Sequence, residues 1–302
     1  SFGLSAGVVD QESKTAATVT DSTITAAPGT VNVKAAAASR LTTGITSLSA
    51  GGLAAGVAGT TAVNNMKSTV EAAVIGSTLT AKTIDVEAEN TVTATATGGA
   101  ASLSGLGGAG ISIAVNTFDD LVKADVAGST LQATGDVTVD AKESRDVKQV
   151  VVNISGGAVA GGANVMVTSV NSAIDNDAAK TKTKELETSF TDTSAQTIGL
   201  SSASGNDGQG DLKKANAVTA DYGGNVAGAG VYTSVRKLAA TSADRLSTIT
   251  AGGTVKLAAE ENSGVAMHGG NAVAGGVSLN GSVGILDVKH ATQVDVSDAA
   301  VS

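Results

Sequence analysis

The sequence of 302 residues contains no Cys, no Trp and a single Pro, and its aromatic residues are only 3 Phe and 2 Tyr. Without Cys the chain has neither disulfide bonds nor thiolate metal sites. One Pro and the lack of a Gly-X-Y period exclude a collagen helix, although 38 residues are Gly. Because so few rings cannot build aromatic girdles at the two membrane interfaces, we expect no membrane insertion.

Charged residues are also scarce, and the acidic ones outnumber the basic ones. Charged residues make up 16% of the chain and give a formal net charge of -9. With no basic cluster to offset this balance, nucleic acid is not an expected partner. Apolar residues nevertheless make up 42% of the chain, which argues against general disorder. The core must therefore be built from Ala, Val, Ile and Leu.

Three short strings recur along the chain in the same order. An alternating Val-x-Val-x-Ala string begins at Val31, Ile84 and Val137, which lie 53 residues apart, with weaker copies at Ile198 and Val255. The other two strings are Ser-Thr-apolar, at Ser22, Ser77, Ser129 and Ser247, and Val followed by a polar residue, at Val9, Val63, Val115 and Val170. A shared period and phase predict one repeat array over residues 1–302, of five to six units that start near residues 31, 84, 137, 198 and 255.

The apolar residues inside the units alternate with polar ones, which predicts strands with one packed face and one wet face. We therefore expect an all-β fold, a repeat β-solenoid (parallel β-helix) with units of roughly 53 residues. Two turns per unit and one wide turn per unit both fit this length. Stacked antiparallel hairpin repeats are the alternative. The one helical pattern, over residues 178–190, predicts a short surface helix.

Each unit also contains a segment without charge, rich in Gly, Ala and Val. Gly doublets within these segments are predicted to be turns, and they lie at Gly51-Gly52, Gly98-Gly99, Gly156-Gly157, Gly223-Gly224 and Gly269-Gly270. The stretch Gly105–Gly110 has the spacing of a dinucleotide-binding loop. A strand pattern, Ile111–Val115, follows it where a helix should begin, so a turn is favoured here too.

Two surface insertions lengthen the later units, near residues 180–190 and 203–213. Loops on one face of a repeat array often carry binding sites, but solvated insertions that the fold tolerates are the simpler interpretation. The second insertion holds Asp207 and Asp211 in a Gly-rich string, a weak candidate for calcium. We expect no other cofactor.

Candidate catalytic residues are few. Asp119 with Asp120, and Asp175 with Asp177, are pairs of carboxylates of the kind that cleave glycans. An outward polar face is the favoured interpretation of both pairs, because other units carry Lys at the equivalent position. His268 and His290 lack the neighbouring ligands of a metal site. We therefore assign no catalytic, cofactor-binding or metal residue and predict that the protein is not an enzyme.

A row of Thr residues, Thr91, Thr93, Thr95 and Thr97, forms one flat line as in an ice-binding face. A solenoid face of this kind needs the same row in every unit. At the same offsets the neighbouring units carry other residues, namely Ala38, Arg40, Thr42 and Gly44, or Ser144, Asp146, Lys148 and Val150. Ice binding is therefore disfavoured.

Together, the Ser-Thr-Leu and Val-x-Val-x-Ala strings and the Gly-Gly-Ala-Val-Ala-Gly-Gly string at Gly156–Gly162 resemble a known kind of sequence. They are similar to the repetitive region of large bacterial filamentous adhesins, the haemagglutinin-like and leukotoxin-like surface proteins of two-partner or autotransporter secretion. The resemblance covers essentially the whole chain. It implies a β-solenoid stalk, export to the cell surface or the extracellular space, and a role in adhesion, with no active-site residues to carry over.

These observations lead to two expectations for the function. The first is a structural and adhesive stalk segment of an extracellular bacterial surface fibre, without catalysis, whose partners are flanking repeats and a ligand on a host or neighbouring cell. Neither end of the sequence carries a polar cap, which terminal solenoid strands need. The alternative is therefore a self-polymerising extracellular filament subunit, which stacks head to tail on other copies through uncapped ends.

Overall fold

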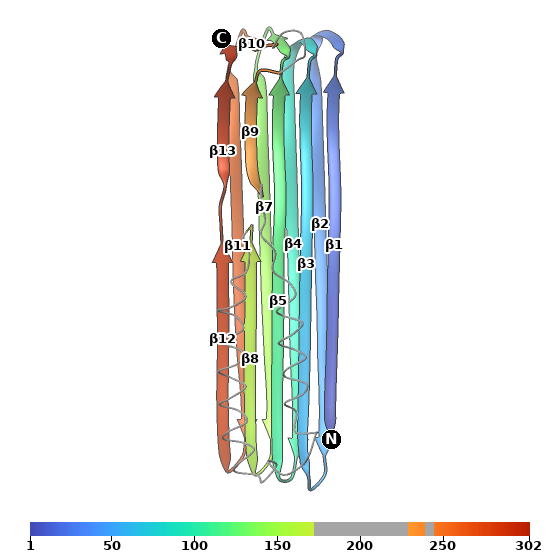
Figure 1. Cartoon of the computed structure of the whole chain (residues 1–302), viewed down its shortest axis with the longest axis vertical. Helices are drawn as coiled ribbons and strands as arrows, with labels where there is room; N and C mark the ends of the chain where they lie inside the picture. Colours follow the sequence, from blue (N-terminus) through green and yellow to red (C-terminus); the bar gives the residue numbers. More distant parts are fainter. Residues whose placement is uncertain (172–228, 239–244) are drawn as a thin grey trace.

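The computed structural model describes residues 1–171, 229–238 and 245–302, and these residues are arranged in strands and the turns between them (Figure 1). The all-β prediction is confirmed. Among the described residues there is no helix, and so none that is long and apolar enough to cross a membrane. The long strands run along the longest axis of the molecule (Figure 1). The segment 178–190, the start predicted at Ile198 and both predicted insertions lie outside the described residues.

In the described parts of the chain, fourteen strands form two sheets. Sheet A contains β1 (Phe2–Thr20), β3 (Ala55–Ile75), β5 (Gly107–Ala127), β8 (Val159–Val170), β9 (Gly230–Arg236), β12 (Val277–Val288) and β13 (Thr292–Ser297). Sheet B contains β2 (Thr23–Gly51), β4 (Thr78–Ser104), β6 (Thr130–Ala133), β7 (Val137–Gly156), β10 (Ser247–Ala251), β11 (Val255–Ala274) and β14 (Ala299–Val301). At up to 29 residues, the strands are far longer than the usual strand of about 5–6 residues.

All pairings between these strands are parallel, and consecutive long strands alternate between the two sheets. The antiparallel hairpin alternative is therefore wrong. The return path of each strand runs through the opposite sheet, so neighbours within a sheet point the same way. Among the described residues, one isolated bridge, Leu238 with Arg245, is antiparallel.

The register of the strands matches the first repeated string. Val31 pairs with Ile84, Ile84 with Val137, and Val137 with Val255. β7 and β11 are thus direct neighbours in sheet B. In sheet A, Phe2 pairs with Val57, and the chain has passed once through each sheet between them.

The Val-polar string aligns less well. Val63 pairs with Val115, but Val9 pairs with Asn64 and Val170 pairs with Phe118. The predicted equivalence is therefore wrong at Val9 and Val170. Since side chains alternate between the faces of a strand, the slip of one residue turns Val9 towards the interior instead of away from it.

The Ser-Thr-apolar string forms a corner between the two sheets. Thr78 pairs with Thr23 and with Thr130, and Thr130 pairs with Thr248. The Ser before each Thr builds a ladder along this corner: the amide of Ser22 donates to Ser77 Oγ at 3.1 Å, that of Ser77 to Ser129 Oγ at 3.0 Å, and that of Ser129 to Ser247 Oγ at 3.4 Å. A left-handed residue precedes the Ser at three corners, Asp21, Gly76 and Gly128. Hydroxyl groups thus satisfy backbone amides where the chain turns.

We predict that Ser129→Ala lowers the free energy of unfolding by about 1–3 kcal/mol, because the buried amide of Ser77 loses its acceptor. Urea unfolding measures the change. Ser144→Ala, at an exposed position of the neighbouring sheet, is the matched control and should stay within about 0.5 kcal/mol of the wild type. Equal unfolding midpoints for the two variants would contradict the structural role of the Ser ladder.

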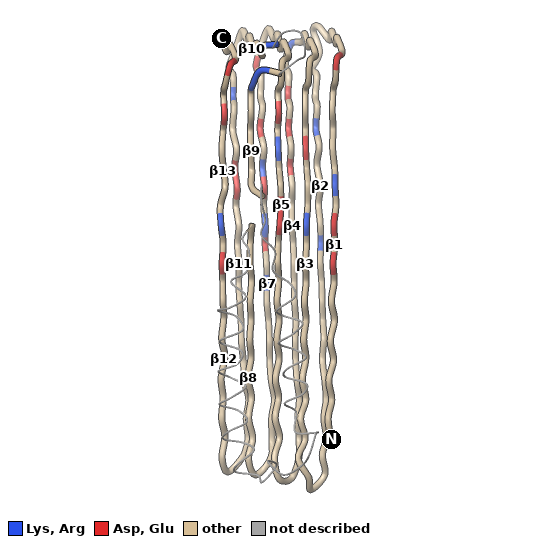
Figure 2. The backbone as a smooth tube through the Cα atoms, viewed as in Figure 1, with Lys and Arg blue, Asp and Glu red and all other residues tan. Residues whose placement is uncertain are grey.

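Charge divides the molecule into two halves along the strands (Figure 2). The charged half holds the Ser corner. The charge-free half contains no Lys, Arg, Asp or Glu, and consists of residues 2–9, 41–66, 94–118, 149–170 and 263–286. The charge-free segments of successive units thus fall side by side because the strands are paired at a constant offset.

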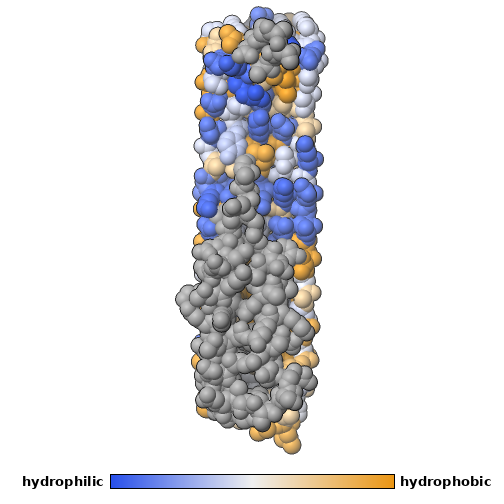
Figure 3. Space-filling view, in the orientation of Figure 1, coloured by the Kyte–Doolittle hydropathy of each residue, from blue (hydrophilic) through white to orange (hydrophobic). Residues whose placement is uncertain are grey.

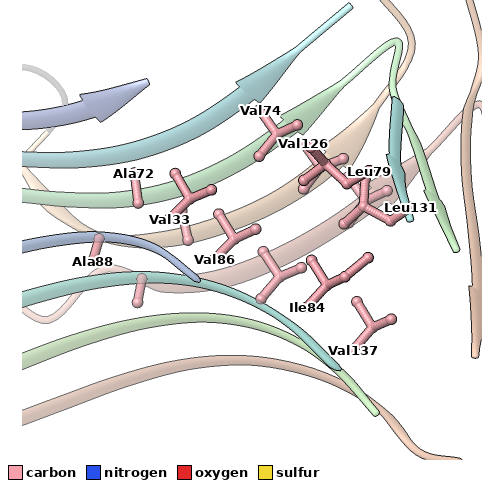
Figure 4. Close-up of a cluster of buried hydrophobic side chains, with 14 of the residues drawn as sticks. Val33, Ala72, Val74, Leu79, Ile84, Val86, Ala88, Val126, Leu131 and Val137 are labelled. Carbon is pink, nitrogen blue, oxygen red and sulfur yellow. The ribbon is translucent and has the colours of Figure 1, made fainter. Parts of the chain in front are cut away.

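Towards the Ser corner, the space between the sheets in the charged half is apolar. Val, Leu and Ile side chains from both sheets interdigitate there, among them Leu79, Ile84 and Leu131, which are completely buried (Figure 4). Each such side chain contributes roughly 1.5–3 kcal/mol when fully buried. This core supports the predicted use of branched aliphatic residues in place of aromatic ones.

The Gly doublets do not all lie in turns. Gly51-Gly52 and Gly156-Gly157 do lie at turns where strands end, as predicted. The turn prediction is wrong for Gly98-Gly99 and Gly269-Gly270, which lie within β4 and β11 and pair with Val151-Val152. At Gly269 a Cβ atom would lie 2.9 Å from the Met166 side chain of the other sheet. Gly therefore makes room here for a larger side chain across the interior.

Candidate functional site

The calcium candidates Asp207 and Asp211 and the carboxylate pair Asp175 and Asp177 lie outside the described residues. Within the described parts of the chain, no group of three or more His, Asp or Glu residues is arranged to hold a metal ion. The stretch Gly105–Gly110 crosses the turn between β4 and β5 and continues as strand, in agreement with the turn interpretation.

Asp119 and Asp120 are consecutive residues of β5 and so point to opposite faces of sheet A. Asp119 pairs with Lys67 on the outward face, as the sequence predicted. The outward interpretation is wrong for Asp120, which is completely buried between the sheets and bound to Arg145. Two carboxylates on opposite faces of a sheet cannot act together on one glycosidic bond.

The buried cluster around Arg145 is the most highly charged site in the interior of the described structure. Arg145 Nη2 contacts Asp120 Oδ2 at 2.6 Å and Glu143 Oε1 at 2.5 Å, and its Nη1 contacts Glu261 Oε1 at 3.4 Å. The Ser263 hydroxyl accepts a further hydrogen bond from Nη1 at 2.9 Å. The side chains of Arg145, Asp120 and Glu143 are completely inaccessible to solvent. Such a cluster is stable only because its opposite charges are in direct contact.

The register explains why these groups meet. In sheet B the inward position equivalent to Glu143 is Ala37 in β2, Asn90 in β4 and Glu261 in β11. In sheet A the position equivalent to Asp120 is Ser68 in β3 and Ser13 in β1. At this level along the strands, the inward side chains therefore become more polar from the first strand of each sheet towards the last.

The cluster also lies at a point where the strand pairing on one side of β5 is interrupted. β8 pairs with β5 as far as Phe118, and β9 resumes the pairing at Leu121. Asp119 and Asp120 occupy the two positions between these pairings. Asn171, at the end of β8, has φ of 50° and accepts a hydrogen bond from the Asp120 amide at 3.0 Å. The buried charges thus sit at the one place where β5 changes its neighbour.

Two carboxyl groups of this region have raised pKa values. Burial, followed by the nearby charge of Asp120, raises the pKa of Glu143 to about 9. The same two causes, in the same order, raise the pKa of Asp119 to about 6. Glu143 therefore keeps its proton at neutral pH, which reduces the excess of negative charge around Arg145.

His290 extends the cluster to the surface, and His268 does not take part in it. His290 Nδ1 lies 3.0 Å from Glu261 Oε1, and its side chain is half exposed beside the last strands. His268 lies in β11 and pairs with Val150 on the outer face of sheet B. The two His residues thus occupy separate places.

In the charge-free half, amide and hydroxyl side chains replace part of the apolar interior. Asn64 Nδ2 donates to Asn116 Oδ1 at 2.8 Å, and Thr43 Oγ1 donates to Asn64 Oδ1 at 2.6 Å from the opposite sheet. A second network joins Asn153 of sheet B to Ser112 and Asn164 of sheet A. These bonds tie the two sheets together where large apolar side chains are few. The networks have the character of structural ladders.

The outer face of sheet B carries exposed apolar side chains in the charge-free half. Leu48, Leu103 and Ile154 are among the exposed large side chains on the outer face of sheet B, and Leu53 and Leu106 lie at the turns, where Leu53 is 87% exposed. In the orientation of Figure 3, hydrophilic residues gather on the charged half. The sequence did not lead us to predict these exposed apolar side chains, although the charge-free segment in each unit was a signal for them.

The Thr row lies on the outer face of β4. Thr91 pairs with Ala38 and Ser144, and Thr97 pairs with Gly44 and Val150. The offsets that the sequence predicted are confirmed, so the row is not continued on either neighbouring strand. The depression beside it, on the outer face of sheet B, is lined by groups of both signs that largely pair with one another: Lys34, Glu87, Glu89, Asp140 and Lys142.

No protein-family model, curated protein or solved structure matches the chain.

We predict that Arg145→Met lowers the free energy of unfolding by about 3–5 kcal/mol, because it leaves buried carboxyl groups without their counter-ion. Lys148→Met is the matched control. Its ion pair with Asp146 is exposed, so this change should cost no more than about 1 kcal/mol. Denaturant unfolding compares the two, and equal losses would show that the Arg145 contacts do not stabilise the fold.

A second prediction concerns pH. Glu143 keeps its proton in the folded chain up to a pKa of about 9, whereas the unfolded carboxyl group loses it near the ordinary value of 4.5. Its contribution to stability is therefore complete below about pH 4.5 and is lost as the pH rises towards 9, with a slope of at most about 1.4 kcal/mol per pH unit.

Glu143→Gln cannot lose a proton, so its stability should fall less between pH 5 and pH 8 than that of the wild type, as measured by urea unfolding at both values. Glu89→Gln, at a half-exposed position on the outer face of sheet B, should keep the wild-type difference. If Glu143→Gln and the wild type showed the same pH dependence, the protonated state of Glu143 would be refuted.

Proposed function

We propose that the chain is a β-solenoid of units near 53 residues and serves as a structural and adhesive stalk segment of an extracellular bacterial surface fibre, without catalysis. The observation that carries this proposal is the constant register, in which Val31, Ile84, Val137 and Val255 follow one another across sheet B. A coil of this kind grows by adding rows without any change in its cross-section.

The interior of the described structure supports a structural role. Asp120, Glu143 and Arg145 are inaccessible to solvent and engage one another. Asp119 is partly exposed, and among the described residues it has no second carboxylate beside it on its own face, because Asp120 points inward. The polar groups that resemble catalytic ones are thus used to hold the two sheets together.

The dimensions favour a broad adhesive surface over a thin spacer. Each row adds only about 4.8 Å along the stack, whereas a strand of about 20 residues is roughly 65 Å long. A small number of repeats is therefore enough to present wide, flat outer faces. The face of sheet B is charged in one half and apolar in the other, with exposed Leu48 and Ile154 in the apolar part. Such a surface offers both polar and apolar contacts to a ligand on another cell.

Antibody labelling tests the proposal. Antibodies raised against the purified chain should label intact bacteria that produce the protein, and gold particles viewed by electron microscopy should lie outside the outer membrane. Beads coated with the purified chain should adhere to target cells, and soluble chain should compete with them. Permeabilised cells provide the control for access.

Labelling that requires permeabilisation would overturn the surface location. Beads that adhere no better than beads coated with an unrelated acidic protein would overturn the adhesive role. A chain that fails only the bead assay would still be a surface segment, so the two parts of the proposal are tested separately.

A further inference from the structure

Three aliphatic side chains on inner strands of sheet B are exposed to solvent. Leu103 of β4 is 53% exposed, and Val152 and Ile154 of β7 are 43% and 49% exposed. β4 pairs with β2 and β7, and β7 pairs with β4 and β11, so neither strand lies at an edge of the sheet. These side chains are therefore exposed through the outer face of the sheet, and their exposure does not depend on where the rows of strands begin or end.

The register gives this face a relief of ridges and grooves. Two adjacent outward rows alternate between larger and smaller residues across the four strands: Leu48, Ala101, Ile154 and Ala272 in one row, and Thr46, Gly99, Val152 and Gly270 in the other. The larger residues fall on β2 and β7, and the smaller ones fall on β4 and β11. Val150, two residues before Val152, continues the ridge along β7. A groove over β4 thus separates the ridges on β2 and β7.

The floor of this groove is open. A Cβ atom added at Gly99 would make only ordinary van der Waals contacts, the nearest at 3.4 Å from the Val152 carbonyl oxygen. Ala101, the next outward residue of β4, is partly exposed between the larger Leu48 and Ile154. The groove over β4 can therefore receive aliphatic side chains from another surface.

We call the outward residues of 44–51, 97–104, 150–156 and 268–274 the apolar face of sheet B. They include no Lys, Arg, Asp or Glu, and their one ionisable side chain is His268, at the margin. Outside this face, the outward charges of sheet B largely pair with one another within the chain, as Lys34 does with Glu87 and Glu89. A charged partner would find no counter-ion on the apolar face.

The size of the apolar face reaches what a specific contact needs. Four strands about 4.8 Å apart, with about eight residues each at about 3.3 Å, cover roughly 500 Å². Contact with an equal face would remove about 1,000 Å² from solvent, which is the lower limit for a specific protein interface. Exposed apolar patches of this size are typical of interaction sites. The area supports a specific but weak dimer.

A second copy of the chain supplies the shape and the polarity that the apolar face requires. A two-fold axis along the strands, between β4 and β7, places Val152 and Ile154 of each copy over Gly99 and Ala101 of the other. The side chains then interdigitate as they do between two packed sheets, which lie about 10 Å apart. Ridge meets groove twice in this arrangement, once on each side of the axis.

We propose that the apolar face of sheet B is an interface between two copies of this chain, with the β7 ridge of each copy in the β4 groove of the other. The contact uses the same patch on both copies, so it closes as a two-fold dimer. It leaves the ends of the rows free and joins two rods side by side, so it is compatible with a segment of a longer fibre. The inference goes beyond the proposed function and does not depend on it.

Sedimentation velocity of the purified chain tests the proposal. Each copy carries a net charge of -9, and salt screens the repulsion between copies, so the measurement is made at high ionic strength. Between about 1 and about 100 µM, the wild type should change from monomer to dimer. A wild type that stays monomeric over this range would overturn the proposal, even if it adsorbed to phosphatidylcholine vesicles.

A charge in the middle of the apolar face should weaken the dimer. Ile154→Lys should raise the dissociation constant at least about tenfold, because the contact would bury an unpaired ammonium group. Ser144→Lys adds the same charge to an exposed outward position of β7, outside the apolar face, and should leave the dissociation constant unchanged. Equal dissociation constants for the two variants would place the contact elsewhere and refute this interface.

Filling the groove tests the fit without adding charge. Ala101→Phe should also raise the dissociation constant at least about tenfold, because the ring occupies the space that receives the ridge. Thr91→Phe, at an exposed outward position of the same strand, is the matched control and should have no effect. A tighter dimer with Ala101→Phe would show that apolar area alone drives association, and would overturn the fit of ridge into groove.

Urea unfolding checks that all four variants fold, as expected for substitutions on an outer face. Surface labelling of cells and the bead assay do not require contact between copies. Failure of the dimer therefore leaves the proposed function to be decided by those experiments, and failure of the proposed function leaves the dimer to be decided by sedimentation.

Discussion

The structure depends on one constraint: each strand pairs in parallel, in register, with the strand about one circuit away along the chain. Every side chain then lies about 4.8 Å from its counterpart in the next row, on the same face. Leu79 lies beside Ile24 and Leu131, and a Ser meets a Ser at the corner. Residues that pack on their own equivalents can be small, branched or hydroxylated, whereas a large ring needs a smaller neighbour. Phe118, the largest fully buried side chain among the described residues, accordingly lies between Met66 and Val170.

The same constraint separates two ways of filling the space between the sheets. The charged half has an apolar interior and a wet outer surface, as in most soluble proteins. The charge-free half has the reverse tendency, with Asn and Ser networks inside and apolar residues outside. The Arg145 cluster lies between these two parts of the interior, beside the point where β5 changes its partner from β8 to β9. Buried charges are costly unless they are paired, so a break in the regular rows, where other groups can be brought in, is a reasonable place for them.

Much of the fold could be predicted from the sequence, because alternation fixes which residues share a face and the repeated strings fix the offset between strands. The offset at Val31, Ile84 and Val137 and the neighbours of Thr91 were both obtained in this way. The Val-polar string failed because the copies at Val9 and Val170 are displaced by one and by three residues, and an odd displacement reverses the face. The charged cluster was detectable in part: Glu143 and Arg145 continue the inward alternation of Val139 and Ala141. Their partner Asp120 comes from the other sheet, and no local pattern in the sequence shows which of two adjacent Asp residues points inward.

The corner ladder bears on how the rows of strands keep their register. Apolar rows alone tolerate a shift of two residues, since Val, Ala and Leu alternate along much of each edge. A corner does not tolerate it, because the chain must turn at one position. In the internal rows each corner amide donates to the Ser hydroxyl of the next row. The last row has Ala299 at this position, paired with Ser247, and is preceded by Asp298 with φ of 48°. The first row has Ser22 there, preceded by Asp21 with φ of 44°. The hydroxyl ladder therefore holds the described rows in one register at the corner, from Ser22 to Ser247.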